Sequence, residues 1–207
     1  MIQEMTLDNV QISLIGRGSL LRASDSMVGM TVAIDEWRPA DGSVLEEQLD
    51  MLADVLHAAV HAGASVSFIL PFSMDEARAF WRDRVLPVVA DGSRRVLVAR
   101  WGERIVGTVQ LNLAQPPNQK HRADVMKLLV HPDFRGRGIA RALMAKLEDV
   151  ARAEGLTLLT LDTRTGDVAE PLYLSMGYVL AGVIPEYARG PASPVLEATS
   201  FLYKKLV

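Results

Sequence analysis

The first half of the chain opens with one alternating and one helical pattern of hydrophobic residues. Residues 30–37 alternate between apolar and polar side chains, which predicts a β-strand, and turn-forming residues follow at 39–42. Apolar residues then recur at helical spacing over residues 45–60, which predicts an amphipathic helix facing the core. Ser43 and Glu46 have the spacing of a capping box, so we expect them to open this helix.

A second helical pattern begins at Ser73 or Asp75 and extends to residue 86. Because this helix precedes the sheet strands, we expect it to cover the acceptor side of a ligand pocket. It carries Trp81, a residue type found more often in a core than on a substrate platform.

The second half of the chain alternates between strand and helix patterns. The predicted strands are residues 96–100, 105–113, 122–130, 156–161, 178–183 and 199–206, and the predicted helices are residues 138–154 and 168–176. A four-residue turn at 101–104 joins the first two strands as a hairpin, and a Pro- and Gly-rich loop at 185–194 separates the last two. A strand, a helix and a strand in succession form a parallel crossover, so the fold class is α/β (α+β) with a mixed sheet of six to seven strands.

Composition limits the kind of protein this is. The 207 residues are enough for one full core, and we expect a single domain with residues 1–28 as an N-terminal extension to which no chemistry can be assigned. The net charge of −3, with 49% hydrophobic residues, gives no basic surface for nucleic acid. Cysteine is absent, which excludes disulfides and thiol catalysis. The N-terminus has acids where a secretory signal has positive charge, and no apolar run is long enough to span a membrane, so we expect a cytoplasmic protein with no membrane partner.

Two histidines are the main candidates for a metal site. His57 and His61 are four residues apart, which places them on one face of the first helix. The zinc-protease pattern needs a Glu directly after the first histidine, and Ala58 stands there. We therefore expect two histidines on a partly exposed helix face, and no metal.

The stretch from Asp124 to Met144 carries the strongest signal in the chain. An apolar strand pattern ends at His131 and Pro132, a loop containing two arginines and two glycines follows, and a helix begins. The first turn of a helix has unpaired backbone N–H groups and partial positive charge, so such a join binds phosphate. Glycine lets the backbone approach the anion, and arginine pairs with its oxygens. A basic turn that merely begins a helix is the alternative.

The loop is neither of the common nucleotide motifs. No Gly-Lys-Ser/Thr follows, as an ATP-binding loop requires, and Ala140 and Arg141 stand where a third glycine of a dinucleotide motif would be. The spacing of Arg135, Gly138 and Ala140 instead resembles the Arg/Gln-x-x-Gly-x-Gly/Ala signature of the GNAT superfamily of N-acetyltransferases, which holds the pyrophosphate of acetyl-coenzyme A. The cofactor-binding residues that follow from the loop and from the edge of the preceding strand are Leu128, Leu129, Val130, Arg135, Gly136, Arg137, Gly138, Ile139, Ala140 and Arg141.

The GNAT resemblance implies a fold and a set of roles. Its fold is a splayed mixed sheet with helices on both faces, in which the strand before the loop diverges from the next one. A backbone N–H in that strand, near Leu128 here, polarises the acetyl carbonyl. The strand edge pairs with the pantetheine arm as an added strand would. The co-substrate is acetyl-CoA, and no metal is needed.

Three side chains are candidates for catalysis. The resemblance implies Tyr173 beside the coenzyme sulfur, where it protonates the departing thiolate or, alternatively, only positions the sulfur by a hydrogen bond. The two acids that flank the predicted parallel strands, Asp124 and Asp162, could attract an ammonium group and take its proton, directly or through water. Asp124 precedes Leu128 by four residues, roughly 13 Å of extended strand, so direct contact needs a bulge or a relaying water.

Within the superfamily, residues 61–190 most resemble the tabtoxin-resistance acetyltransferases, which acetylate the amine of a β-lactam toxin. By position, their paired acidic residues fall on Asp124 and Asp162 and their general acid on Tyr173, with Asp124 replacing a Glu. The resemblance implies transfer to the primary amine of a small molecule, such as a toxin or antibiotic-like amine, by a protein that can form a homodimer. Two alternatives stay open: a non-catalytic acyl-CoA sensor, and an acetyltransferase acting on protein amines.

Overall fold

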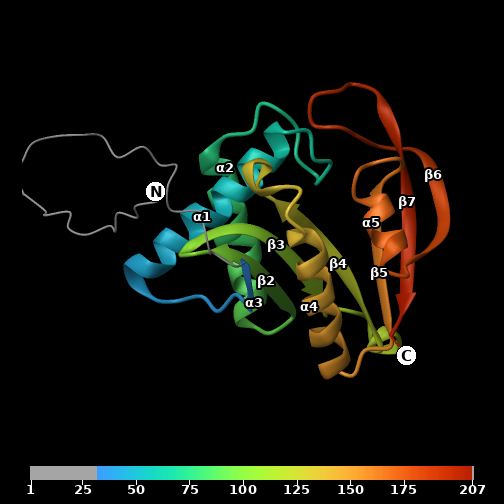
Figure 1. Ribbon diagram of the computed structural model, residues 1–207, viewed down its shortest axis with the longest axis horizontal. Coiled ribbons are helices and arrows are strands. Elements are labelled where there is room, and N and C mark those ends of the chain that lie inside the picture. The colour runs from blue at the N-terminus through green and yellow to red at the C-terminus, as the bar shows by residue number, and fades with distance from the viewer. Residues whose placement is uncertain (1–31, 207) are drawn as a thin grey trace, which may run out of the picture. The chain divides into compact units, whose positions relative to one another are not determined.

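A seven-stranded mixed sheet organises the computed structural model, which describes residues 32–206 (Figure 1). The strands lie in the order β1-β2-β3-β4-β5-β7-β6. Their bounds are Val32–Glu36 (β1), Arg94–Trp101 (β2), Arg104–Asn112 (β3), Arg122–Val130 (β4), Leu158–Arg164 (β5), Val179–Arg189 (β6) and Leu196–Lys205 (β7). The predicted mixed sheet is thereby confirmed.

The sheet divides at the contact between β4 and β5. Every other neighbouring pair is antiparallel, whereas β4 and β5 are parallel and pair only over residues 122–124 and 158–160. Beyond Asp124 and Thr160 the two strands part, although β4 continues to Val130 and β5 to Arg164. Within residues 32–206 no strand pairs with the backbone edges that face this gap, and a cavity opens there.

Helices cover both faces of the sheet, as Figure 1 shows. On one face α1 (Gly42–His61), α2 (Met74–Ala79) and the π-helical segment η1 (Phe80–Val85) pack on buried residues of the central strands such as Val96 and Val98. On the other face α4 (Ile139–Ala153) and α5 (Glu170–Ser175) pack on their alternating neighbours, including Leu97 and Ala99. The period-two alternation of a strand therefore supplies both cores. The short helix α3 (Leu86–Ala90) leads into β2.

Helix starts follow the sequence signals only in part. The prediction that Ser43 and Glu46 cap α1 is wrong, because Asp41 occupies the N-cap position without a side-chain hydrogen bond and Glu46 pairs with Arg78 of α2 instead. A capping box does open α2, where Ser73 and Glu76 satisfy each other's backbone N–H groups. The Glu46 carboxylate, to which the local pattern assigned a capping role, is therefore used in an ion pair between two helices.

Two strand predictions also change. The predicted loop at 185–194 is shorter, since β6 continues to Arg189 by pairing with β7 across two register shifts. β5 begins later and extends further than predicted, so Asp162 lies within the strand and not at its end. The hairpin turn between β2 and β3 is confirmed. The predicted extension at residues 1–28 lies outside the described residues, and none of the helices between residues 32 and 206 is long and apolar enough to cross a membrane.

Candidate functional site

A cavity of about 750 Å³ lies where β4 and β5 part. The loop and first turn of α4 line it, together with Asp162, Tyr173 and residues 62–67, which follow α1. We refer to the part lined by residues 62–67 and Asp162 as the acceptor end. The cavity is large enough for an extended ligand that enters between the strands. The predicted splay thus exists, and the phosphate-binding loop and two of the three predicted catalytic side chains share one cavity.

A β-bulge in β4 shapes the middle of this cavity. Leu129 pairs with Thr108 and Met126 pairs with Gln110, so Lys127 and Leu128 together oppose a single residue of β3. A bulge leaves the extra residue out of the ladder and turns the strand locally. Lys127 accordingly has a backbone φ of +51°, a value that residues other than glycine rarely adopt. The backbone of Leu128, to which the GNAT resemblance assigned the acetyl carbonyl, therefore lies at a break in the ladder and lines the cavity.

The loop before α4 fits a pyrophosphate. Gly136 and Gly138 have positive φ values of 75° and 76°, and a Cβ added at either would meet no atom within 4 Å, so the space beside them is open to a ligand. Gly138 caps α4 without any side-chain hydrogen bond, and the first turn holds no acidic residue. The backbone N–H groups of Ile139 and Ala140 are thus available to an anion at the positive end of the helix.

All predicted cofactor-binding residues line the cavity except Arg137. The Arg137 guanidinium lies over the Trp101 ring, 5.2 Å from its centroid, at the back of the loop. Arg135 donates to the Val130 carbonyl oxygen (3.3 Å) and Arg141 donates to Ser175 Oγ (2.7 Å). Neither forms an ion pair with a carboxylate of the described residues, which leaves their charges available to phosphate oxygens.

Tyr173 reaches the cavity from α5. The side chain is only 6% exposed and packs with Tyr178, at 5.8 Å between ring centroids. Burial raises the pKa of the Tyr173 phenol above its ordinary value, and the negative charges of Asp167 and Asp162 act in the same direction. The hydroxyl therefore stays protonated at neutral pH and can donate a hydrogen bond to a ligand in the cavity.

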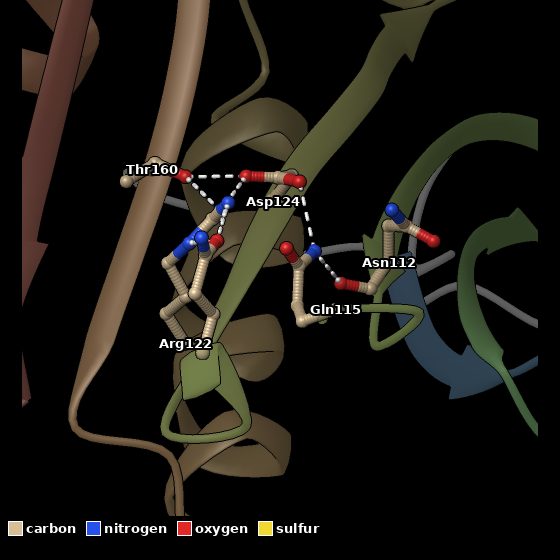
Figure 2. Close-up of polar contacts among 6 residues, drawn as sticks. Asn112, Gln115, Arg122, Asp124 and Thr160 are labelled. Carbon is tan, nitrogen blue, oxygen red and sulfur yellow. Dashed lines mark hydrogen bonds and ion pairs between the residues drawn. The ribbon is translucent and has the colours of Figure 1, made fainter. Parts of the chain in front are cut away.

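The two predicted acids have different surroundings. Asp162 lies in β5 two residues beyond the last pair with β4, is exposed, and lines the cavity. Asp124 does not line it, and its carboxylate is already engaged, as Figure 2 shows. It accepts hydrogen bonds from Thr160 Oγ1 (2.5 Å) and Gln115 Nε2 (2.8 Å) and forms an ion pair with Arg122 (2.5 Å). These contacts join β4 to β5 at their last paired residues.

The electrostatics of Asp124 match this arrangement. Burial raises the pKa of its carboxyl, but hydrogen bonds from Thr160 and Gln115 and the charge of Arg122 outweigh burial and hold the pKa below its usual value. A carboxylate stabilised in this way is a weaker base. Asp124 thus holds β4 to β5 at the point where the two strands part.

Lys127 is a cavity residue that the sequence analysis missed. Its Nζ donates to the Val66 carbonyl oxygen (2.7 Å) and to Ser67 Oγ (3.2 Å). The available signal was a lone charged residue inside the apolar run of β4. Periodicity alone gives no reason to choose between an exposed strand position and a site.

The acceptor end is covered differently from the prediction. Trp81 is fully buried in the core against Trp37, and no residue of α2 or η1 lines the cavity. Residues 62–67 line it instead, and the backbone N–H of Leu70, just beyond them, donates to the Pro191 carbonyl oxygen of the β6–β7 loop (2.8 Å). Two loops far apart in sequence thus join beside the acceptor end.

The histidine pair lies outside the cavity. The rings of His57 and His61 are 4.1 Å apart between centroids, and His61 Nε2 lies 2.8 Å from the Phe72 carbonyl oxygen. Between residues 32 and 206 no group of three or more side chains is arranged to hold a metal ion.

The splayed sheet, the uncapped helix behind a glycine loop and the buried tyrosine that meet at one cavity match what the GNAT resemblance predicted. The sequence profile of the Acetyltransferase (GNAT) family matches residues 58–178, and the chain belongs to this family.

Known proteins agree with this assignment. The chain is 34% identical to rat N-acetyltransferase 8B over 131 residues, which is 56% of this chain and 59% of that protein. It is 30% identical to the N-acetyltransferase of the hisH–hisA intergenic region of Azospirillum brasilense, over 58% of this chain and 70% of that one. The chain thus spans well under two thirds of the length of the rat relative.

Solved structures share the fold. The yncA protein of Salmonella typhimurium, solved with its cofactor acetyl-CoA, superposes with a TM-score of 0.66 at 18% identity, over 85% of this chain and 94% of that one. An N-acetyltransferase from Staphylococcus aureus gives a TM-score of 0.68 at 18% identity, over 86% and 99%. At this identity the likeness shows the GNAT fold.

Proposed function

We propose that this protein transfers an acetyl group from acetyl-CoA to the primary amine of a small molecule, by direct attack of the amine on the thioester. The observation that carries the proposal is the cavity at the β4–β5 splay, which the glycine loop, Asp162 and Tyr173 line together. Acetyl-CoA fits this cavity with its pyrophosphate on the first turn of α4 and its thioester near Leu128.

Tyr173 serves the departing sulfur. Its phenol has a pKa above the ordinary value of about 10, whereas a thiol has a pKa near 8.5, so complete proton transfer to the thiolate is uphill by at least about 2 kcal/mol. A hydrogen bond needs no such transfer and grows stronger as negative charge develops on sulfur. Tyr173 therefore acts first as a hydrogen-bond donor to the leaving group.

Asp162 is the better candidate for the base. It lines the cavity, is exposed, and can take the proton of the attacking ammonium through water. Asp124 shares the base role in the family resemblance, but here its carboxylate is bound by three neighbours. We assign Asp124 the task of holding β4 and β5 together where they begin to part, beside the cavity that Asp162 and Leu128 line.

A small acceptor is favoured over a protein. The backbone bond between Leu70 and Pro191 joins two loops beside the acceptor end, and a long polypeptide acceptor needs an open groove there. The tabtoxin-resistance resemblance is consistent with a small amine. A protein acceptor, or an acyl-CoA sensor without turnover, is the competing outcome of the experiment below.

A screen for thiol release tests the function. Acetyl-CoA is incubated with the full chain and with separate amines: amino acids, polyamines, aminoglycosides and β-lactam-like amines. Thiol release with at least one small amine is expected, and the Tyr173→Phe and Asp162→Asn variants should both lower it. Tight binding of acetyl-CoA without thiol release on any of these amines contradicts the proposal and favours the sensor. Acetylation confined to peptide amines favours the protein acceptor.

We also propose a homodimer formed through the β6 edge of the sheet. β6 is exposed along nearly its whole length and carries apolar side chains that are about half exposed, namely Val179, Leu180, Val183, Ile184 and Tyr187. An exposed, apolar edge strand is a ready template for pairing with another strand. Light scattering should give twice the mass of the chain, and Ile184→Lys should return it to the monomer.

A further inference from the structure

Lys127 is a cation in the cavity without a counter-ion. Its ammonium uses two donors on neutral oxygens of Val66 and Ser67, and within residues 32–206 it forms no ion pair. Two other half-buried cations differ, since Arg122 pairs with Asp124 and Lys204 pairs with Glu148. A partly buried charge is costly unless it is paired, so an anion supplied from outside the chain is the natural partner for the third donor.

The backbone at Lys127 points to function as well. A non-glycine residue with φ of +51° is strained, and such residues persist where the surrounding structure imposes them, often at ligand sites. At this bulge the Lys127 side chain contacts residues 66 and 67, which line the acceptor end of the cavity. We therefore expect Lys127 to have a different role from Arg135 and Arg141, the arginines assigned to pyrophosphate.

Charges of both signs act on Lys127. Burial lowers the pKa of its ammonium to about 8, the negative charge of Asp162 opposes this, and the positive charge of Arg94 adds to it. Arg94 contacts Gln110 through a hydrogen bond of 3.2 Å and has no ion pair among the described residues. The acceptor end thus has positive charge on the β4 side and the carboxylate of Asp162 on the β5 side.

A tether is the competing explanation for Lys127. Its two hydrogen bonds hold residues 66 and 67 against β4, and the ammonium also lies 5.6 Å from the centroid of the Phe68 ring. A tether explains the contacts but does not require a carboxylate on the acceptor. The two roles differ in one measurable respect, because a tether affects all acceptors alike whereas a carboxylate contact discriminates between acceptors.

We propose that Lys127 binds a carboxylate of the acceptor, so that the acceptor is an amino acid or an amine of similar form, with its amine directed toward Asp162 and its carboxylate toward Lys127. This inference rests on the proposed acetyltransferase function and names its substrate class. Lys127 is then a specificity-determining residue and takes no part in the bond changes.

Matched acceptors test the proposal. Thiol release from acetyl-CoA is measured for several L-amino acids and for the amide of each, which keeps the amine and side chain but removes the negative charge. A charge-assisted hydrogen bond predicts that the acid is favoured in kcat/KM by about tenfold or more. In Lys127→Met the ratio of acid to amide should fall toward one, and Lys127→Arg should recover part of it. Lys120→Met removes an exposed lysine outside the cavity and should keep the wild-type ratio.

The outcomes separate the two proposals. No thiol release with any amine overturns the acetyltransferase function. Turnover in which amides or carboxylate-free amines equal the acids, or a ratio that Lys127→Met leaves unchanged, overturns the carboxylate site while the function stands. If Lys127→Met does not fold, calorimetric binding of the amino acid and its amide to the wild-type protein saturated with CoA decides. Equal affinity for both refutes the proposal.

Discussion

Gly107 lies where β3 closely approaches β4 and α4, and its replacement by alanine tests this packing. Gly107 is in β3 opposite Val130 of β4. A Cβ placed there would be 2.9 Å from the Leu129 carbonyl oxygen and 3.3 Å from side-chain carbons of both Ile139 and Leu143. Gly107 therefore permits the close contact of β3 with β4 and α4, the two elements to which we assign the acyl group and the pyrophosphate.

The expected cost follows from this geometry. The Leu129 oxygen must recede by roughly half an ångström to reach ordinary contact, and it belongs to the backbone, which cannot simply rotate away. Overpacking of this kind costs about 1–3 kcal/mol, and we expect the upper part of that range. For a domain of this size the melting temperature should fall by roughly 5–10 °C. The displaced β4–α4 join should also weaken acetyl-CoA binding by about tenfold, because its N–H groups no longer converge on one anion.

Urea unfolding measures the stability of the variant, and titration calorimetry measures its affinity for acetyl-CoA. Gly182→Ala is the matched control, because Gly182 lies in the exposed strand β6 and an added Cβ there would meet no atom within 4 Å. That variant should stay within about 0.5 kcal/mol of the wild type. A Gly107→Ala protein as stable as Gly182→Ala, with unchanged affinity for acetyl-CoA, would refute the packing described for β3, β4 and α4.

Three further predictions concern Tyr173, Asp124 and Lys127. Tyr173→Phe should lower kcat by about 10–100-fold with little change in acetyl-CoA affinity, measured by steady-state kinetics and calorimetry, because only the bond to the leaving sulfur is lost; an equal fall in affinity would show a packing role instead. Asp124→Asn should lower the free energy of unfolding by about 1–2 kcal/mol, a value reduced for the partial exposure of the ion pair with Arg122. Because its folded pKa is lowered, this contribution is fully present above the unfolded pKa and is lost as pH falls through the folded value, so wild type and variant should converge in acid unfolding curves. The preference for acids over amides should decline as pH rises through about 8, where Lys127 loses its charge, and a preference that persists at pH 10 would contradict the carboxylate contact.

The sequence by itself determined the local elements and the binding loop. The glycines at 136 and 138, the arginines around them and the apolar strand before them are close in the chain, and their chemistry requires a strand, an anion-binding loop and a helix in that order. The hairpin between β2 and β3 and the capping box at Ser73 are likewise short-range. The GNAT resemblance predicted helices on both faces of the sheet, and alternating residues of β2 are indeed buried on both sides.

Only the tertiary structure decided the parts that depend on register. The sequence makes Asp124 and Asp162 equivalent acids at strand ends, but pairing stops at Thr160, so one carboxylate is bound at the apex of the splay and the other lines the cavity. One extra residue in β4 places Lys127 at the acceptor end, and no local pattern announces such a bulge. These outcomes depend on contacts between residues about 35 to 60 positions apart. Local propensity and hydrophobic period carry no information about them.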